Sequence, residues 1–68
     1  MRQVLVFPGE DGMWVAECPS LPGCIAQGDT KEAAIANIRE AIELYIETLV
    51  EDGIEVPDDH FDALLVAV

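Results

Sequence analysis

The chain has 68 residues, of which 51% are hydrophobic, and its three basic and fourteen acidic side chains give a formal net charge of −11. This length supports one domain near the lower limit at which a single core folds without help, so we expect the chain to bury further apolar surface in a homodimer or against a partner. The negative charge would repel a phosphate backbone, which argues against direct binding of nucleic acid.

The same charge complements a basic protein partner, although an acidic surface also simply keeps a small protein soluble. No apolar run is long enough to span a bilayer, and the amino terminus lacks a basic region followed by a hydrophobic stretch. The sequence therefore predicts a cytosolic protein with no membrane partner.

The first predicted elements form a β-hairpin. Residues 3–7 are rich in β-branched and aromatic side chains, as strands are, and the turn cluster at residues 8–12 contains two glycines able to take positive φ. Residues 13–18 predict a second strand, with Trp14 and Cys18 on the same face.

A proline-rich turn separates the second strand from the third. Pro19 and Pro22 fix φ and remove two hydrogen-bond donors, and Gly23 lets the chain reverse. Residues 24–27 then return as a third strand. This order predicts a three-stranded antiparallel meander.

A long amphipathic helix is predicted from residue 31 to about residue 52. Thr30 is a suitable N-cap, and Gly53 is a suitable left-handed residue after the helix ends. Apolar residues recur at steps of three and four, forming a broad stripe that must pack on the meander. The stripe consists of Ala34, Ile35, Ile38, Ala41, Ile42, Tyr45, Ile46 and Leu49.

The chain ends in a segment that is apolar on both faces. After a polar connection containing Pro57, residues 63–68 predict a final strand. Either one face of this strand meets the helix and the other meets a second subunit, or the strand lies between two others.

No catalytic or metal-binding constellation is recognisable. Ser20, the only serine, lies in the proline-rich turn, and we interpret His60, the only histidine, as a solvated loop residue among aspartates. We interpret Cys18 and Cys24 as two small buried thiols rather than a disulfide. The sequence therefore predicts no enzyme, no metal and no cofactor.

Three motifs in a fixed order resemble the HicB family, the antitoxin half of a two-component toxin–antitoxin system. They are Leu-Pro-Gly-Cys at residues 21–24, Gly-Asp-Thr at residues 28–30 and the alanine-rich helix that follows. The similarity runs from about residue 2 to the end. It implies a single α+β domain over residues 1–68 with the order β-β-β-α-β, in which one helix packs on one face of a four-stranded sheet similar to a truncated ribonuclease H fold.

The resemblance also implies a partner, a small basic HicA-type toxin that cleaves mRNA and whose active surface the antitoxin covers as a dimer. We expect the contacts to come from exposed acids and one aromatic residue: Trp14, Glu40, Glu43, Glu47, Asp58 and Asp59. Many family members carry a DNA-binding segment after this core. None follows here, so we do not expect this chain to repress its own promoter.

An alternative function is that of an orphan homodimeric interaction domain without a toxin partner. Such a domain would use the same acidic surface to bind another protein, or would hold a small ligand in the groove beside residues 19–24. Trp14 is either a partner contact or part of the core, because its strand has two apolar faces and the helix covers only one.

Overall fold

The computed structural model describes residues 2–59 and 66–67. Its sheet has three antiparallel strands, β1 (Leu5–Pro8), β2 (Trp14–Glu17) and β3 (Ile25–Gly28), in the spatial order β1-β2-β3. This is the meander that the sequence predicts.

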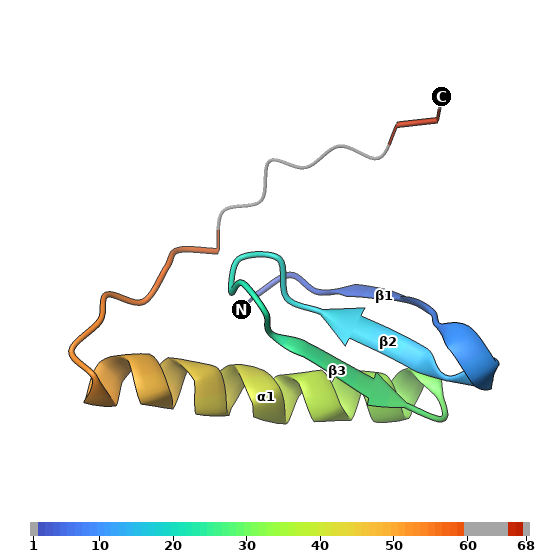
Figure 1. Cartoon of the computed structure of the whole chain (residues 1–68), viewed down its shortest axis with the longest axis horizontal. Helices are drawn as coiled ribbons and strands as arrows, with labels where there is room; N and C mark the ends of the chain where they lie inside the picture. The colour runs from blue at the N-terminus through green and yellow to red at the C-terminus, as the bar shows by residue number, and fades with distance from the viewer. Residues whose placement is uncertain (1, 60–65, 68) are drawn as a thin grey trace.

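A long helix, α1 (Lys31–Glu51), follows the sheet and lies along one of its faces (Figure 1). A helix over one face of an antiparallel sheet is an α+β arrangement, so the predicted fold class is confirmed. The final strand predicted at residues 63–68 lies outside the described residues except for Val66 and Ala67, which are exposed and belong to no strand.

The register of the sheet turns every second side chain toward the helix. Ala16 of β2 lies between Val6 of β1 and Ala26 of β3, and Ala16 is fully buried. Leu5 and Phe7 lie one residue to either side of Val6, point to the opposite face and stay exposed. The inner face therefore supplies the core, while the outer face keeps apolar side chains in contact with solvent.

β1 begins two residues later than predicted and includes Pro8, which lies opposite Trp14. Proline has no N–H to donate to a neighbouring strand, so it is found at the edges of sheets. It is tolerated at this position because β1 is an edge strand among the described residues.

The turn between β1 and β2 contains a short 3-10 helix, η1 (Glu10–Gly12), in which φ is 58° at Asp11 and 74° at Gly12. Of the two glycines that the sequence indicates as able to take positive φ, Gly12 does so and Gly9 does not. Its φ is −98°, and a Cβ at this position would lie 2.7 Å from the Val15 Cγ2 atom. Gly9 therefore makes room for a side chain instead of reversing the chain.

α1 begins and ends close to the residues that the sequence indicates. The Thr30 Oγ1 atom accepts a hydrogen bond from the Ala33 N–H at 3.0 Å, which caps the first turn. Beyond the last turn, φ is 69° at Gly53. Its N–H and the following N–H donate to the carbonyls of Val50 and Leu49 at 3.1 and 2.9 Å, which together form a Schellman motif.

The junction between β3 and α1 is tight enough to require glycine. A Cβ at Gly28 would lie 2.7 Å from the Ala33 carbonyl carbon and still closer to the Ala34 nitrogen. Both are backbone atoms of the first helical turn and cannot rotate away. Gly28 therefore fixes how closely the helix approaches the sheet.

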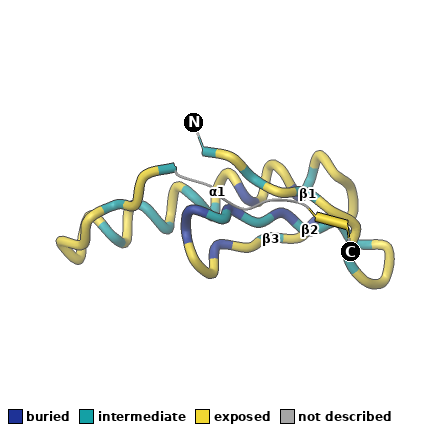
Figure 2. Tube along the Cα trace, turned by 90° about the horizontal axis from the view of Figure 1, so that it is seen from above, coloured by how far each residue is buried: buried dark blue, intermediate teal, exposed yellow. Residues whose placement is uncertain are grey.

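The buried core lies where α1 crosses β2 and the turn between β2 and β3 (Figure 2). Leu21 and Ile38 are its large members, and burial of each contributes roughly 1.5–3 kcal/mol. The predicted helix stripe is confirmed at its centre, although Ile35 at its margin is exposed. The fully buried core residues are Ala16, Cys18, Leu21, Cys24, Ala34 and Ile38.

Candidate partner-binding surface

Two consecutive β-turns connect β2 to β3, and we call residues 18–24 the double turn. The Cys18 carbonyl accepts from the Leu21 N–H at 3.1 Å, and the Leu21 carbonyl accepts from the Cys24 N–H at 3.0 Å. Each turn has proline at its second position, and Gly23 has φ 81° at the third position of the second turn. A bond of 3.0 Å from the Cys18 N–H to the Cys24 carbonyl closes the loop and leaves Leu21 fully buried inside it.

The two cysteines of the double turn are free thiols and are 1% and 4% exposed. Burial, and secondarily the neighbouring Cys18, raises the pKa of the Cys24 thiol above 9.0, the ordinary value for this group. A protonated, covered thiol is a weak nucleophile. The interpretation of Cys18 and Cys24 as buried thiols is therefore confirmed.

A polar cluster connects the double turn to the start of the chain and to residues 57–59. The Ser20 hydroxyl donates to Asp59 Oδ1 and accepts from Arg2 Nη1, both at 3.0 Å. Arg2 also donates to the Pro57 carbonyl at 2.6 Å, and the Gln3 N–H donates to Asp59 Oδ2 at 3.0 Å. Ser20 thus has a structural role in holding residues 57–59 against the start of the chain.

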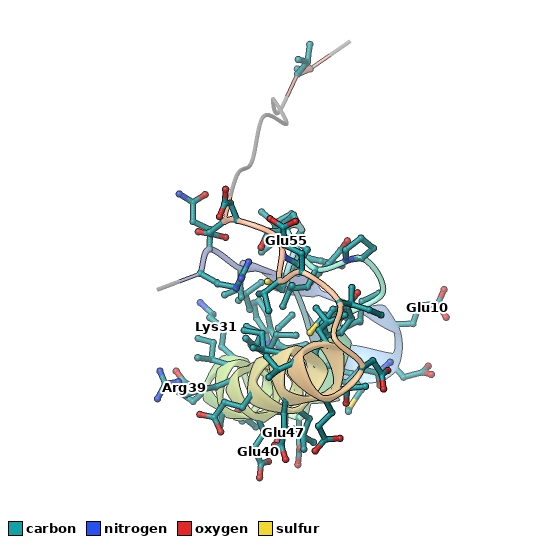
Figure 3. The ribbon with its side chains drawn as sticks, turned by 90° about the vertical axis from the view of Figure 1, so that its left-hand side faces the viewer. Glu10, Lys31, Arg39, Glu40, Glu47 and Glu55 are labelled. Carbon is teal, nitrogen blue, oxygen red and sulfur yellow. The ribbon has the colours of Figure 1, made fainter. Side chains whose placement is uncertain are left out.

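Three of the predicted contact residues, Glu40, Glu43 and Glu47, lie together on the outside of α1 and are exposed. Together with the exposed Glu51 they form what we call the acidic helix face. Glu40 and Glu47 point away from the sheet (Figure 3). The structure therefore brings these carboxylates together on a surface that a partner can reach.

The other three predicted contacts lie elsewhere. Trp14 is half-buried and packs against the core, with the Lys31 Nζ atom 5.0 Å from its ring centroid. Asp59 is half-buried and engaged in the polar cluster, whereas Asp58 is exposed. These residues form no continuous surface with the acidic helix face, and their role in binding stays a prediction. His60 lies outside the described residues.

Two of the three cations of the chain lie away from the acidic helix face, and the third, Arg39, shares a groove with Glu43. Arg2 belongs to the polar cluster, and Lys31 lies over Trp14. Arg39 projects from the side of α1, where it lines a groove of about 560 Å³ with Arg2 and Val4 beside β1. We call this the β1 groove.

A second groove, of about 400 Å³, lies on the other side of α1, and we call it the β3 groove. Its wall is largely apolar, and Leu44 and Ile25 in it are 63% and 53% exposed. Tyr45 forms its floor beside the double turn and donates from its hydroxyl to the Pro22 carbonyl at 2.9 Å. The groove beside the double turn is anticipated in the sequence, but its second wall on α1 is not. The signal for that wall is Leu44, an apolar residue among the glutamates of the helix's polar side.

The described residues contain no group of three or more histidine, cysteine, aspartate or glutamate side chains placed to hold a metal ion. Within the same part of the chain, no helix combines the length and apolarity needed to cross a membrane.

Comparison with known proteins identifies the family. Residues 3–65 match the family described as HicB_like antitoxin of bacterial toxin-antitoxin system. The chain belongs to the HicB-like antitoxin family. It is 43% identical over 63 residues to a UPF0150 protein of Thermoplasma acidophilum, across 93% of this chain and 91% of that protein. It is 57% identical over 56 residues to a UPF0150 protein of Synechocystis, across 82% and 71% of the two chains.

A solved structure extends the comparison to the fold of the HicB-like family. The N-terminal domain of the Burkholderia pseudomallei antitoxin HicB matches with a TM-score of 0.71 and 32% identity, over 91% of this chain and 69% of that chain. Family and fold together support an antitoxin-like, regulatory function for this HicB-like chain.

Proposed function

We propose that this HicB-like chain binds a small basic HicA-type toxin and covers the surface with which that toxin holds mRNA. The observation that carries the proposal is the acidic helix face, where Glu40, Glu43 and Glu47 are exposed and Arg39, beside Glu43, is the one cation close to them. A ribonuclease must be basic where it holds RNA, so an anionic protein surface competes for the same site. The mechanism is occlusion, and the chain makes or breaks no bond itself.

The proposed setting is the cytosol, where such a toxin meets mRNA. A reducing compartment suits the two buried thiols, because Cys18 and Cys24 remain free although they flank the same turn. Asp58, exposed between two residues of the polar cluster, is proposed as a peripheral contact that contributes to charge attraction.

The test of this function is rescue of growth. A HicA-type protein encoded beside this chain's gene is expressed alone and then together with the chain, and an unrelated acidic protein of similar size serves as the control. Growth arrest by the neighbour that only this chain relieves, together with co-purification of the two proteins, is the expected result. Arrest that the chain does not relieve would contradict the proposal.

A second candidate function, an orphan homodimeric interaction domain, is favoured by the outer face of the sheet. Leu5 and Phe7 are 45% and 40% exposed there, on the face that α1 does not cover. Two copies that packed these faces together would remove apolar surface from water while keeping their acidic helix faces apart. Homodimerisation is compatible with either function, and the absence of a basic neighbouring gene would favour the orphan domain.

A further inference from the structure

The β3 groove is an apolar surface left open beside the acidic helix face. It lies between the start of β3 and the carboxyl-terminal half of α1, and the side chains of Ile25 and Leu44 are more exposed than those of ordinary core residues. A groove of about 400 Å³ accommodates one large side chain of a partner. The described chain offers no side chain of its own to fill it.

The charges around this groove are all of one sign. Glu40 and Glu47 precede and follow Leu44 by four and three residues, so all three lie side by side on the helix surface. Seven residues separate the two glutamates, which places them about 10 Å apart along the helix axis at ~1.5 Å per residue. The groove is therefore an apolar pocket with a carboxylate at each end of its outer wall.

We propose that the β3 groove receives an apolar side chain of the basic toxin, flanked on the toxin by two cations that pair with Glu40 and Glu47. This inference rests on the proposed function and names the surface that carries it out. On a helical partner segment, cations about seven residues apart have the required spacing of about 10 Å. On an extended segment, cations about three residues apart have the same spacing of about 10 Å. Apolar contact supplies the affinity, and the paired charges supply orientation and rate of association.

Charge distribution selects this occupant over the others. A second copy of the chain would bring its own acidic helix face toward Glu40 and Glu47, whereas the three cations of the chain lie over Trp14, in the polar cluster and in the β1 groove. The β1 groove does not suit a basic partner in the same way, because Arg2 and Arg39 line it with a single carboxylate, that of Glu43. The β3 groove is thus the apolar depression that matches a cationic protein.

The experiment compares two substitutions to lysine at equally exposed apolar positions of α1. Leu44 and Val50 are both apolar, both on α1 and both 63% exposed, and they lie about 120° apart around the helix axis. Binding of the neighbouring HicA-type protein to Leu44→Lys and Val50→Lys is measured by calorimetry, after circular dichroism has shown that both variants are folded. We expect the Kd to rise at least about tenfold for Leu44→Lys and by less than about threefold for Val50→Lys. A lysine at residue 44 removes an apolar contact in the groove, whereas residue 50 lies outside the groove.

A charge-matched pair tests the two glutamates. Glu40→Gln combined with Glu47→Gln is compared with Glu10→Gln combined with Glu55→Gln, so both double variants lose the same net charge. Slower association for the first pair alone supports the inference.

Three outcomes would overturn the groove assignment, and the first of them would also overturn the proposed function. If the unaltered chain does not bind the toxin, the proposed function and the groove assignment both fail. If it binds but Leu44→Lys binds equally tightly, the groove assignment alone fails. If Leu44→Lys changes the mass of the isolated chain in light scattering, the groove is a contact between copies, and the inference is wrong.

Discussion

At the scale of single residues, Gly28 is the glycine at which an added Cβ atom would make the closest contacts. Its Cβ would meet backbone atoms of Ala33 and Ala34, and relief requires α1 to move away from β3. We expect Gly28→Ala to lower the free energy of unfolding by about 1–3 kcal/mol, measured by urea denaturation.

The matched control for Gly28 is Gly12→Ala, where a Cβ meets nothing within 4 Å and only the positive φ of 74° opposes the substitution. That strain costs roughly 1 kcal/mol. A loss of stability at Gly28 no greater than that at Gly12 would contradict the tight junction.

Ser20 is the buried hydroxyl that connects Arg2 and Asp59. Ser20→Ala removes both hydrogen bonds, and we expect a loss of about 1–2 kcal/mol in the free energy of unfolding because each partner keeps another bond. Thr48→Ala is the control, since the Thr48 hydroxyl donates only to the Leu44 carbonyl on an exposed turn. Equal effects of the two substitutions would show that the polar cluster contributes nothing.

The Cys24 thiol gives the fold a dependence on alkaline pH. Burial, with a smaller contribution from Cys18, raises the pKa of Cys24 above 9.0 in the folded state. Between the unfolded and folded pKa values the folded protein holds a proton that the unfolded chain has lost, so stability is complete below the unfolded pKa and declines as pH rises through this range.

The expected result is a midpoint of urea denaturation that falls above about pH 9 in the native protein and falls less in Cys24→Ala. The same steepness in both proteins would assign the effect to other groups.

At the scale of elements, α1 carries negative charge at its carboxyl end, where the helix dipole favours positive charge. Glu51 lies at the negative end of the helix dipole, four residues after Glu47, whereas Glu32 lies in the favourable first turn. We expect Glu51→Lys to stabilise the protein by about 0.5 kcal/mol and Glu32→Lys to destabilise it by a similar amount. Thermal unfolding followed by circular dichroism checks both, and the same sign for the two reversals would contradict the dipole argument.

Elements set by local chemistry are predictable from the sequence. Thr30 caps the helix and Gly53 follows its end because those roles depend on neighbours three or four residues away. The requirement for Gly28 is different, since it depends on how the helix folds back on β3. The bond between Ser20 and Asp59 spans 39 residues, and no local pattern indicates it.

The candidate site also has one part that the sequence predicts and one part that depends on the fold. The acidic helix face follows from helical spacing alone, so Glu40, Glu43 and Glu47 are found together as predicted. The β3 groove forms only where the double turn and α1 come together, so the sequence alone does not indicate that Leu44 lines a groove. For Trp14, the sequence leaves the role open, and the structure places its ring beneath Lys31.

At the scale of the whole molecule, the acidic helix face and the apolar outer face of the sheet lie on opposite sides. The acidic helix face keeps two copies apart, and the outer sheet face with Leu5 and Phe7 permits them to meet. We expect light scattering at micromolar concentration to report twice the chain mass of 7.4 kDa. Phe7→Glu should return the mass to that of one chain, and a single-chain mass for the unaltered protein would contradict the dimer.

Whether this HicB-like chain shields a basic protein with an anionic surface is decided by calorimetric titration of the purified chain with a HicA-type protein at two salt concentrations. We expect a saturable complex whose Kd rises by about tenfold or more between about 0.05 and 0.3 M salt, because screening weakens charge attraction. Absence of a complex at low salt, or a Kd that salt does not change, would contradict it.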